Sequence, residues 1–132
     1  DMVMNIGFLK SAMYEEVKEE ISLIKQAIGN KVLKVIIETC FLTDDEKIKA
    51  CKLSVEAGAD FVKTSTGFGS AGANLEDTAL MLDVVKGRAL VKASGGVRDF
   101  ETAKAYIEQG VMRLGTSNGI AILKGLEAKN TY

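Results

Sequence analysis

The sequence has 132 residues, 47% hydrophobic and 27% charged, a composition typical of one soluble globular domain. Its net charge of −1 offers no basic surface for nucleic acid or an anionic membrane, and no apolar run is long enough to span a bilayer. The absence of histidine excludes Ser–His and Cys–His catalysis and histidine-ligated metals. Lysine, carboxylate, hydroxyl and backbone groups remain as candidates for catalysis.

Short apolar strands alternate with amphipathic helices along the chain. We expect strands over residues 2–6, 32–38, 60–64, 89–93 and 112–115, because these runs are rich in Val, Ile, Leu and Met. Helices are expected in the intervals between them. The first helix has one apolar stripe, which is formed by Val17, Ile21, Ile24 and Ile28.

Capping signals mark the boundaries of the later helices. Thr43 begins the second helix with a capping-box pattern, and Gly58 is suited to its end. Asn74 and Asp99 are N-cap candidates for the third and fourth helices, and Gly110 ends the fourth.

This alternation predicts an α/β fold with a parallel sheet, either doubly wound or part of a TIM (β/α)8 barrel. Lys34, Lys63 and Lys92 recur every 29 residues, each inside an otherwise apolar strand. Equivalent residues on successive strands are typical of a ring of repeated units, so we favour the barrel. A complete barrel has eight strands and about 250 residues. Residues 1–132 are therefore interpreted as one domain of five βα units, which is a partial barrel.

Lys63 is the candidate nucleophile. Strand alternation places its side chain inside the barrel, near the carboxyl end of its strand, where barrels carry catalytic groups. Burial or a second cation lowers the pKa of a lysine and makes its amine reactive. Lys92 occupies the matching position one unit later, so the pair predicts a Schiff-base site. The alternative is that Lys63 forms an ion pair with a carboxylate such as Glu38.

Lys34 and Glu38 lie four residues apart, on the same face of one expected strand. We interpret them as interior polar scaffolding in which Glu38 neutralises Lys34. Lys34 could also join the other two lysines.

Two loops after the last strands carry residues suited to an anion, namely Gly95, Gly96, Gly115, Thr116, Ser117 and Asn118. The loops after the seventh and eighth strands of a barrel commonly bind phosphate, because glycine lets backbone N–H groups approach and hydroxyl groups add donors. The segment 67–72 has the composition of a phosphate loop but lacks the Gly-Lys-Ser/Thr ending of one. We interpret it as a mobile loop between a strand and a helix.

Several segments resemble the deoxyribose-phosphate aldolase family: 33–39 (LKVIIET), 57–67 (AGADFVKTSTG) and 91–98 (VKASGGVR). Residues 1–5 (DMVMN) are similar to the family's fourth strand. The resemblance covers essentially the whole chain, and it implies that the five units correspond to the family's strands 4 to 8.

The resemblance implies a class I aldolase that reversibly cleaves 2-deoxy-D-ribose 5-phosphate to D-glyceraldehyde 3-phosphate and acetaldehyde, with no metal or cofactor. It implies that Lys63 forms the imine, that Lys92 tunes Lys63 and assists proton transfer, and that Asp1 relays protons through water. Substrate and phosphate would be bound by Thr66, Gly67, Gly95, Gly96, Gly115, Ser117 and Asn118. Asn118 stands where serine is commoner in the family, and Tyr132 matches a C-terminal tyrosine that some members fold over the site.

The family's first three βα units have no counterpart in this sequence. We therefore expect the chain to act as a homo-oligomer or with a complementing N-terminal segment, and to be impaired alone. One alternative is a non-catalytic half-barrel that self-associates through its open edges. Another is a different phosphate-binding barrel enzyme, such as a transaldolase-like lyase. Cys40 and Cys51 are interpreted as free thiols in a reducing cytoplasm.

Overall fold

Five short parallel strands form one sheet within residues 1–125, which are the residues that the computed structural model describes. They are β1 (Met2–Val3), β2 (Lys34–Ile36), β3 (Phe61–Lys63), β4 (Leu90–Ser94) and β5 (Arg113–Gly115). Their order in the sheet follows their order in the chain, and every neighbouring pair is parallel. A doubly wound sheet reverses its strand order at a switch point, whereas a barrel does not. The expected partial barrel is therefore confirmed.

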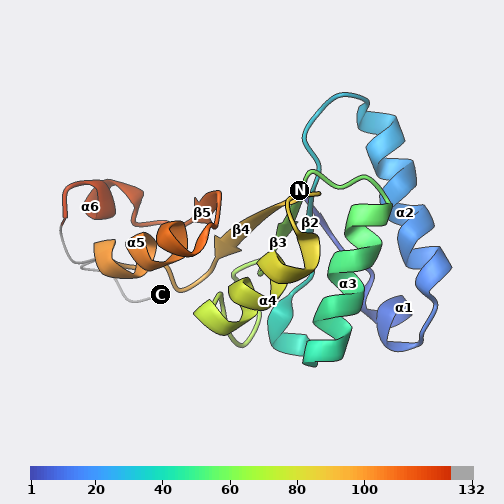
Figure 1. Cartoon of the computed structure of the whole chain (residues 1–132), viewed down its shortest axis with the longest axis horizontal. Helices are drawn as coiled ribbons and strands as arrows, with labels where there is room; N and C mark the ends of the chain where they lie inside the picture. The colour runs from blue at the N-terminus through green and yellow to red at the C-terminus, as the bar shows by residue number, and fades with distance from the viewer. Residues whose placement is uncertain (126–132) are drawn as a thin grey trace.

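Helices connect the strands and pack against one another in chain order, as Figure 1 shows. They are α1 (Ile6–Lys10), α2 (Tyr14–Ile28), the 3-10 helix η1 (Thr39–Phe41), α3 (Asp44–Glu56), α4 (Leu75–Val85), α5 (Phe100–Gln109) and α6 (Gly119–Leu123). Each long helix thus returns the chain to the start of the next strand, which is the repeated unit of a barrel. Tyr132 lies outside the described residues.

The capping signals are confirmed. Thr43 and Glu46 form the complete capping box at the start of α3. The side chains of Asn74 and Asp99 accept hydrogen bonds from backbone N–H groups at the starts of α4 and α5. Gly110 ends α5 in the left-handed conformation, with φ 109°.

Four of the five expected strands are shorter than the apolar pattern indicated, and the first two differ most. The strand expected over 2–6 ends at Val3, and Ile6 already belongs to α1, because the Asn5 side chain accepts the N–H of Phe8 and caps that helix. The strand expected over 32–38 covers only Lys34–Ile36. Glu38 adopts φ 51°, a left-handed conformation that no strand residue has.

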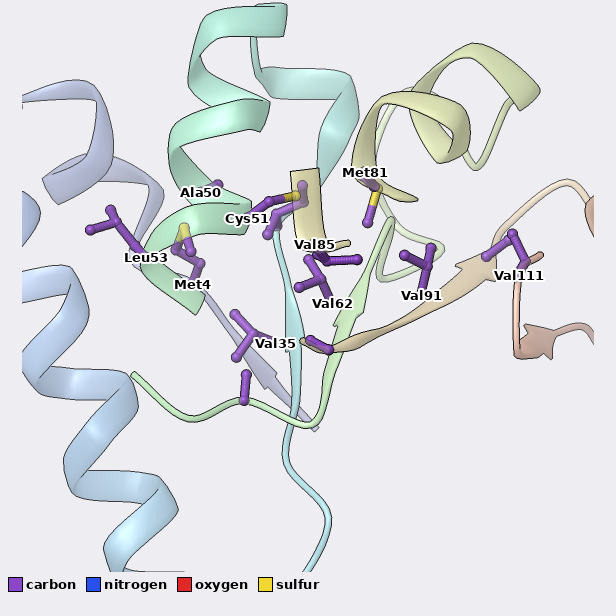
Figure 2. Close-up of a cluster of buried hydrophobic side chains, with 14 of the residues drawn as sticks. Met4, Val35, Ala50, Cys51, Leu53, Val62, Met81, Val85, Val91 and Val111 are labelled. Atoms are coloured by element: carbon purple, nitrogen blue, oxygen red, sulfur yellow. The ribbon is translucent and has the colours of Figure 1, made fainter. Parts of the chain in front are cut away.

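The core lies between the sheet and the helices. Alternation turns Val35, Val62 and Val91 towards the helical side, where they are fully buried. They meet side chains from α3 and α4, including Cys51 and Met81, as Figure 2 shows. Both cysteines are free, and burial raises the pKa of the Cys51 thiol to about 12. Cys51 therefore serves packing and is protonated at neutral pH.

A buried ion pair joins α3 to α4. The Lys47 ammonium lies 2.6 Å from Asp77, and the two side chains are only 11% and 10% exposed. Asn74 also donates to Asp77, so the carboxylate is held at the start of α4. This pair fixes the relative position of two of the helices that support the strand ends.

Candidate active site

Three cations lie side by side on the face of the sheet that is opposite the helices. Lys63 of β3 is in register with Lys92 of β4, and Lys92 is in register with Arg113 of β5. Neighbouring strands are about 4.8 Å apart, so the three side chains emerge close together from one row. The pairing of Lys63 and Lys92 that the sequence predicted is therefore present.

Asp1 bridges two lysines of this face. One of its carboxylate oxygens lies 2.8 Å from the Lys34 ammonium, and the other lies 3.0 Å from that of Lys63. The side chains of Lys34 and Lys63 are 16% and 12% exposed, so both groups are largely shielded from water. The structure thus brings together Asp1, Lys34, Lys63 and Lys92.

Glu38 does not neutralise Lys34, so this part of the sequence interpretation is wrong. Its left-handed backbone turns the carboxylate away from the line of β2, and Thr66 donates to it from the next loop. The alternative to a reactive amine was an ion pair between Lys63 and a carboxylate such as Glu38, and the structure does show such a pair, although not with Glu38. Lys63 does contact a carboxylate, but it is that of Asp1.

Burial and neighbouring cations favour the neutral amines of both central lysines. Burial and the positive charge of Lys34 lower the pKa of Lys63, while the Glu38 carboxylate opposes them. Burial and the charges of Lys63, Lys34 and Arg113 lower the pKa of Lys92. The positive charge of Lys63 is therefore one of the causes that lower the pKa of Lys92.

Arg113 is the charged group that the sequence reasoning missed. Its guanidinium lies 4.6 Å from the centre of the Phe61 ring, an arrangement in which the cation is attracted to the aromatic face. Alternation along the last strand could have found it, because Leu114 packs on the core and its neighbour must then point to the opposite face.

A pocket of about 610 Å³ opens at the carboxyl ends of β3, β4 and β5. All seven residues expected to bind substrate or phosphate line it together with Lys63, namely Thr66, Gly67, Gly95, Gly96, Gly115, Ser117 and Asn118. Among the described residues, Lys92 and Asp1 do not line this pocket. The pocket therefore joins the candidate nucleophile to the candidate anion-binding loops.

Close backbone contact shapes the pocket floor. A Cβ atom on Gly72 would lie 2.4 Å from the carbonyl carbon of Gly95, so the loops after β3 and β4 touch at a point where only glycine fits. Gly95 and Gly96 both have positive φ angles near 80°. The Thr116 hydroxyl is less available to bind an anion than the sequence suggested, because it donates to the Val97 carbonyl at 2.6 Å.

Residues 1–125 contain no group of three or more His, Cys, Asp or Glu side chains placed to hold a metal ion. None of the helices in the same range has the length and apolar character needed to cross a membrane.

Comparison with known proteins relates this geometry to a family. Residues 1–125 match the model of the DeoC/LacD family of aldolases. A deoxyribose-phosphate aldolase from Brevibacillus brevis is 60% identical over 131 residues, which cover 99% of this chain and 58% of that protein. The chain thus spans less than two thirds of the length of the curated relatives it matches.

Solved structures of two aldolases are similar to this chain. An aldolase called QR15 has a TM-score of 0.89 and 48% sequence identity, over 92% of this chain and 55% of that one. The tetrameric deoxyribose phosphate aldolase from Aeropyrum pernix has a TM-score of 0.76 and 33% identity, over 84% of this chain and 49% of that one. Sequence, fold and the lysine row therefore lead to one assignment: the chain belongs to the DeoC/LacD family of aldolases.

Proposed function

We propose that the protein is a class I aldolase that cleaves 2-deoxy-D-ribose 5-phosphate through an imine on Lys63, and also catalyses the reverse reaction. The observation that carries the proposal is the position of Lys63. It lies between the Asp1 carboxylate and Lys92 and borders the pocket whose other walls are glycine and hydroxyl loops. The curated relatives that bear the name deoxyribose-phosphate aldolase support the choice of substrate.

The reaction begins with addition of the neutral Lys63 amine to the aldehyde carbon C1, followed by loss of water to give a protonated imine. One product has two carbons and the other has three, so the bond that breaks is C2–C3. The imine accepts the electron pair of that bond and becomes an enamine, while the C3 hydroxyl loses its proton and becomes the aldehyde of D-glyceraldehyde 3-phosphate. Protonation at C2 and hydrolysis then release acetaldehyde and restore the amine.

The neighbouring groups have separate parts in this scheme. Asp1 receives the C3 hydroxyl proton through a water molecule, because its carboxylate already lies 3.0 Å from the Lys63 nitrogen. Lys92 lowers the pKa of Lys63 by charge repulsion and shuttles a proton at C2. The backbone groups of Gly95, Gly96 and Ser117 hold the phosphate away from the reacting carbons.

Reductive trapping tests the assignment of the nucleophile. Borohydride with 2-deoxyribose 5-phosphate should fix a mass adduct, and digestion should map the adduct to Lys63. Lys63→Ala should lose the adduct while keeping the wild-type circular dichroism spectrum. Lys10→Ala, which removes an exposed lysine of α1, is the control and should trap normally. Trapping of the Lys63→Ala variant at the wild-type level would refute the assignment.

We further propose that the working enzyme is an assembly in which additional βα units, from a complementing N-terminal segment or from other copies of this chain, pair with the open sheet edges. Within residues 1–125, β1 and β5 each pair with only one neighbouring strand, and Val3 of β1 and Met112 just before β5 are about half exposed. Light scattering across a concentration series, with turnover measured in the same samples, tests this. A monodisperse monomer with full turnover would contradict it.

A self-associating half-barrel without catalytic activity is the competing proposal, and the same open edges support it. The two proposals differ in the trapping experiment, because a non-catalytic assembly forms no adduct at Lys63.

The proposed site of action is the cytoplasm, where a phosphorylated sugar and free thiols are both expected.

A further inference from the structure

We propose that Glu38 is a positioning residue of this site: its buried carboxylate holds the loop of residues 66–70 against the end of β2, and its negative charge acts on Lys63. This inference rests on the proposed function only where it concerns imine formation. The part that concerns the loop stands on the contacts alone.

The backbone at Glu38 is arranged to present the carboxylate. Glu38 lies two residues after the end of β2 and adopts φ 51° and ψ 69°, a left-handed conformation that costs a non-glycine residue on the order of 1 kcal/mol. Its side chain is 4% exposed, and among residues 1–125 it takes part in no salt bridge. A buried carboxylate without a cation must be stabilised by hydrogen-bond donors.

Thr66 supplies those donors from the loop that follows β3. Its backbone N–H lies 3.3 Å from both carboxylate oxygens of Glu38, and its hydroxyl donates to one of them at 2.5 Å. The same hydroxyl accepts the N–H of Phe68 at 3.1 Å. The carboxylate thus orders a turn of the loop through one threonine side chain.

The loop also packs directly on Glu38. A Cβ atom on Gly69 would lie 3.1 Å from a carboxylate oxygen of Glu38 and 2.7 Å from the Cys40 sulfur, so the loop backbone rests on these two side chains. Thr66, Gly67 and Gly69 all line the pocket. The position of Glu38 therefore sets the position of one pocket wall.

The charge of Glu38 also reaches the nucleophile. Lys63 is faced by Asp1 at the start of β1, by Lys34 and Glu38 from β2, and by Lys92 from β4. Within this group the Glu38 carboxylate raises the pKa of Lys63, against burial and Lys34. Removing the charge should lower the pKa of Lys63 further.

Three variants separate the effect of Glu38 on the position of the loop from the effect of its charge on Lys63. Glu38→Gln removes the charge but keeps an oxygen that can accept from Thr66. Glu38→Ala removes both the charge and the acceptor. Thr66→Val keeps the charge and removes the hydroxyl that binds it. Glu19→Gln, on the exposed side of α2, is the matched control for loss of one carboxylate.

Hydrogen exchange of the amides at residues 66–70 measures how strongly Glu38 and Thr66 protect the loop from opening to solvent. Exchange should become faster by tenfold or more in Glu38→Ala, and faster in Thr66→Val, with a smaller change in Glu38→Gln and none in Glu19→Gln. Unchanged exchange in both Glu38→Ala and Thr66→Val would overturn the positioning role. This measurement needs no substrate, so it remains decisive if the proposed function fails.

The pH dependence of borohydride trapping with acetaldehyde measures the effect of charge. The midpoint of the trapping curve should move to lower pH in both Glu38 variants and stay in place in Glu19→Gln. A midpoint that stays in place in Glu38→Gln would overturn the electrostatic part. If the wild-type protein forms no adduct at Lys63, the proposed function fails, and the exchange data alone then decide the role of Glu38.

Discussion

Replacement of Lys34 by methionine should make Lys63 a poorer nucleophile at neutral pH, although Lys34 itself forms no imine in the proposed reaction. Lys34 and Lys63 share the two oxygens of one carboxylate, at 2.8 and 3.0 Å. The positive charge of Lys34 lowers the pKa of Lys63. Without it, the repulsion disappears and Asp1 is left to contact Lys63 alone. Both consequences stabilise the Lys63 ammonium, so its pKa should rise.

The size of the effect follows from the charge separation. At about 6 Å and an effective dielectric constant of about 20, two unit charges repel by roughly 3 kcal/mol, equal to about two pKa units. Water at the open side of the sheet screens part of this, so we expect a rise of about one unit. At any pH well below the midpoint, the neutral amine then becomes about tenfold rarer.

The assay is the rate of borohydride trapping at Lys63, measured from pH 6 to pH 10 with acetaldehyde. Lys34→Met should trap about tenfold more slowly at pH 7 and approach the wild-type rate at high pH, which separates a pKa change from a damaged site. Lys104→Met, on the exposed side of α5, is the control and should match the wild type. A midpoint that is unchanged, or that moves to lower pH, would refute the reasoning.

Two further variants test the lysine pair and its support. Lys92→Leu should also move the trapping midpoint to higher pH, because the in-register cation is lost; an unchanged curve would mean that burial and Lys34 alone tune Lys63. Lys47→Met should lower the free energy of unfolding by about 3 kcal/mol in urea titrations, since it leaves Asp77 buried without its cation. Adding Asp77→Asn to Lys47→Met should recover part of the lost stability. A Lys47→Met variant as stable as the wild type would show that the Lys47–Asp77 ion pair contributes little to the free energy of unfolding.

Local patterns in the amino-acid sequence predicted the order of the strands and helices and singled out Lys63 and Lys92 as candidate residues. Continuous aliphatic runs predicted all five strands, because strands of a parallel sheet are covered on both faces and show no polar alternation. Thr43, Asn74 and Asp99 predicted helix starts, because capping depends on residues only a few positions apart. The 29-residue spacing predicted the pairing of Lys63 with Lys92, but it did not predict the register of Lys34, which pairs with Phe61 and not with Lys63.

Which charged side chains come into contact depends on how the strands pair and on individual backbone angles. Asp1 contacts Lys34 and Lys63 across 33 and 62 residues of sequence, a choice of partner that local patterns do not encode. Spacing alone paired Lys34 with Glu38, and this was wrong because one left-handed residue at the end of β2 turns the carboxylate towards Thr66. The row that places Arg113 beside Lys92 likewise exists only once β4 and β5 pair. Contacts of this kind depend on strand register and on single backbone angles, and these are set by packing of the whole sheet against its helices.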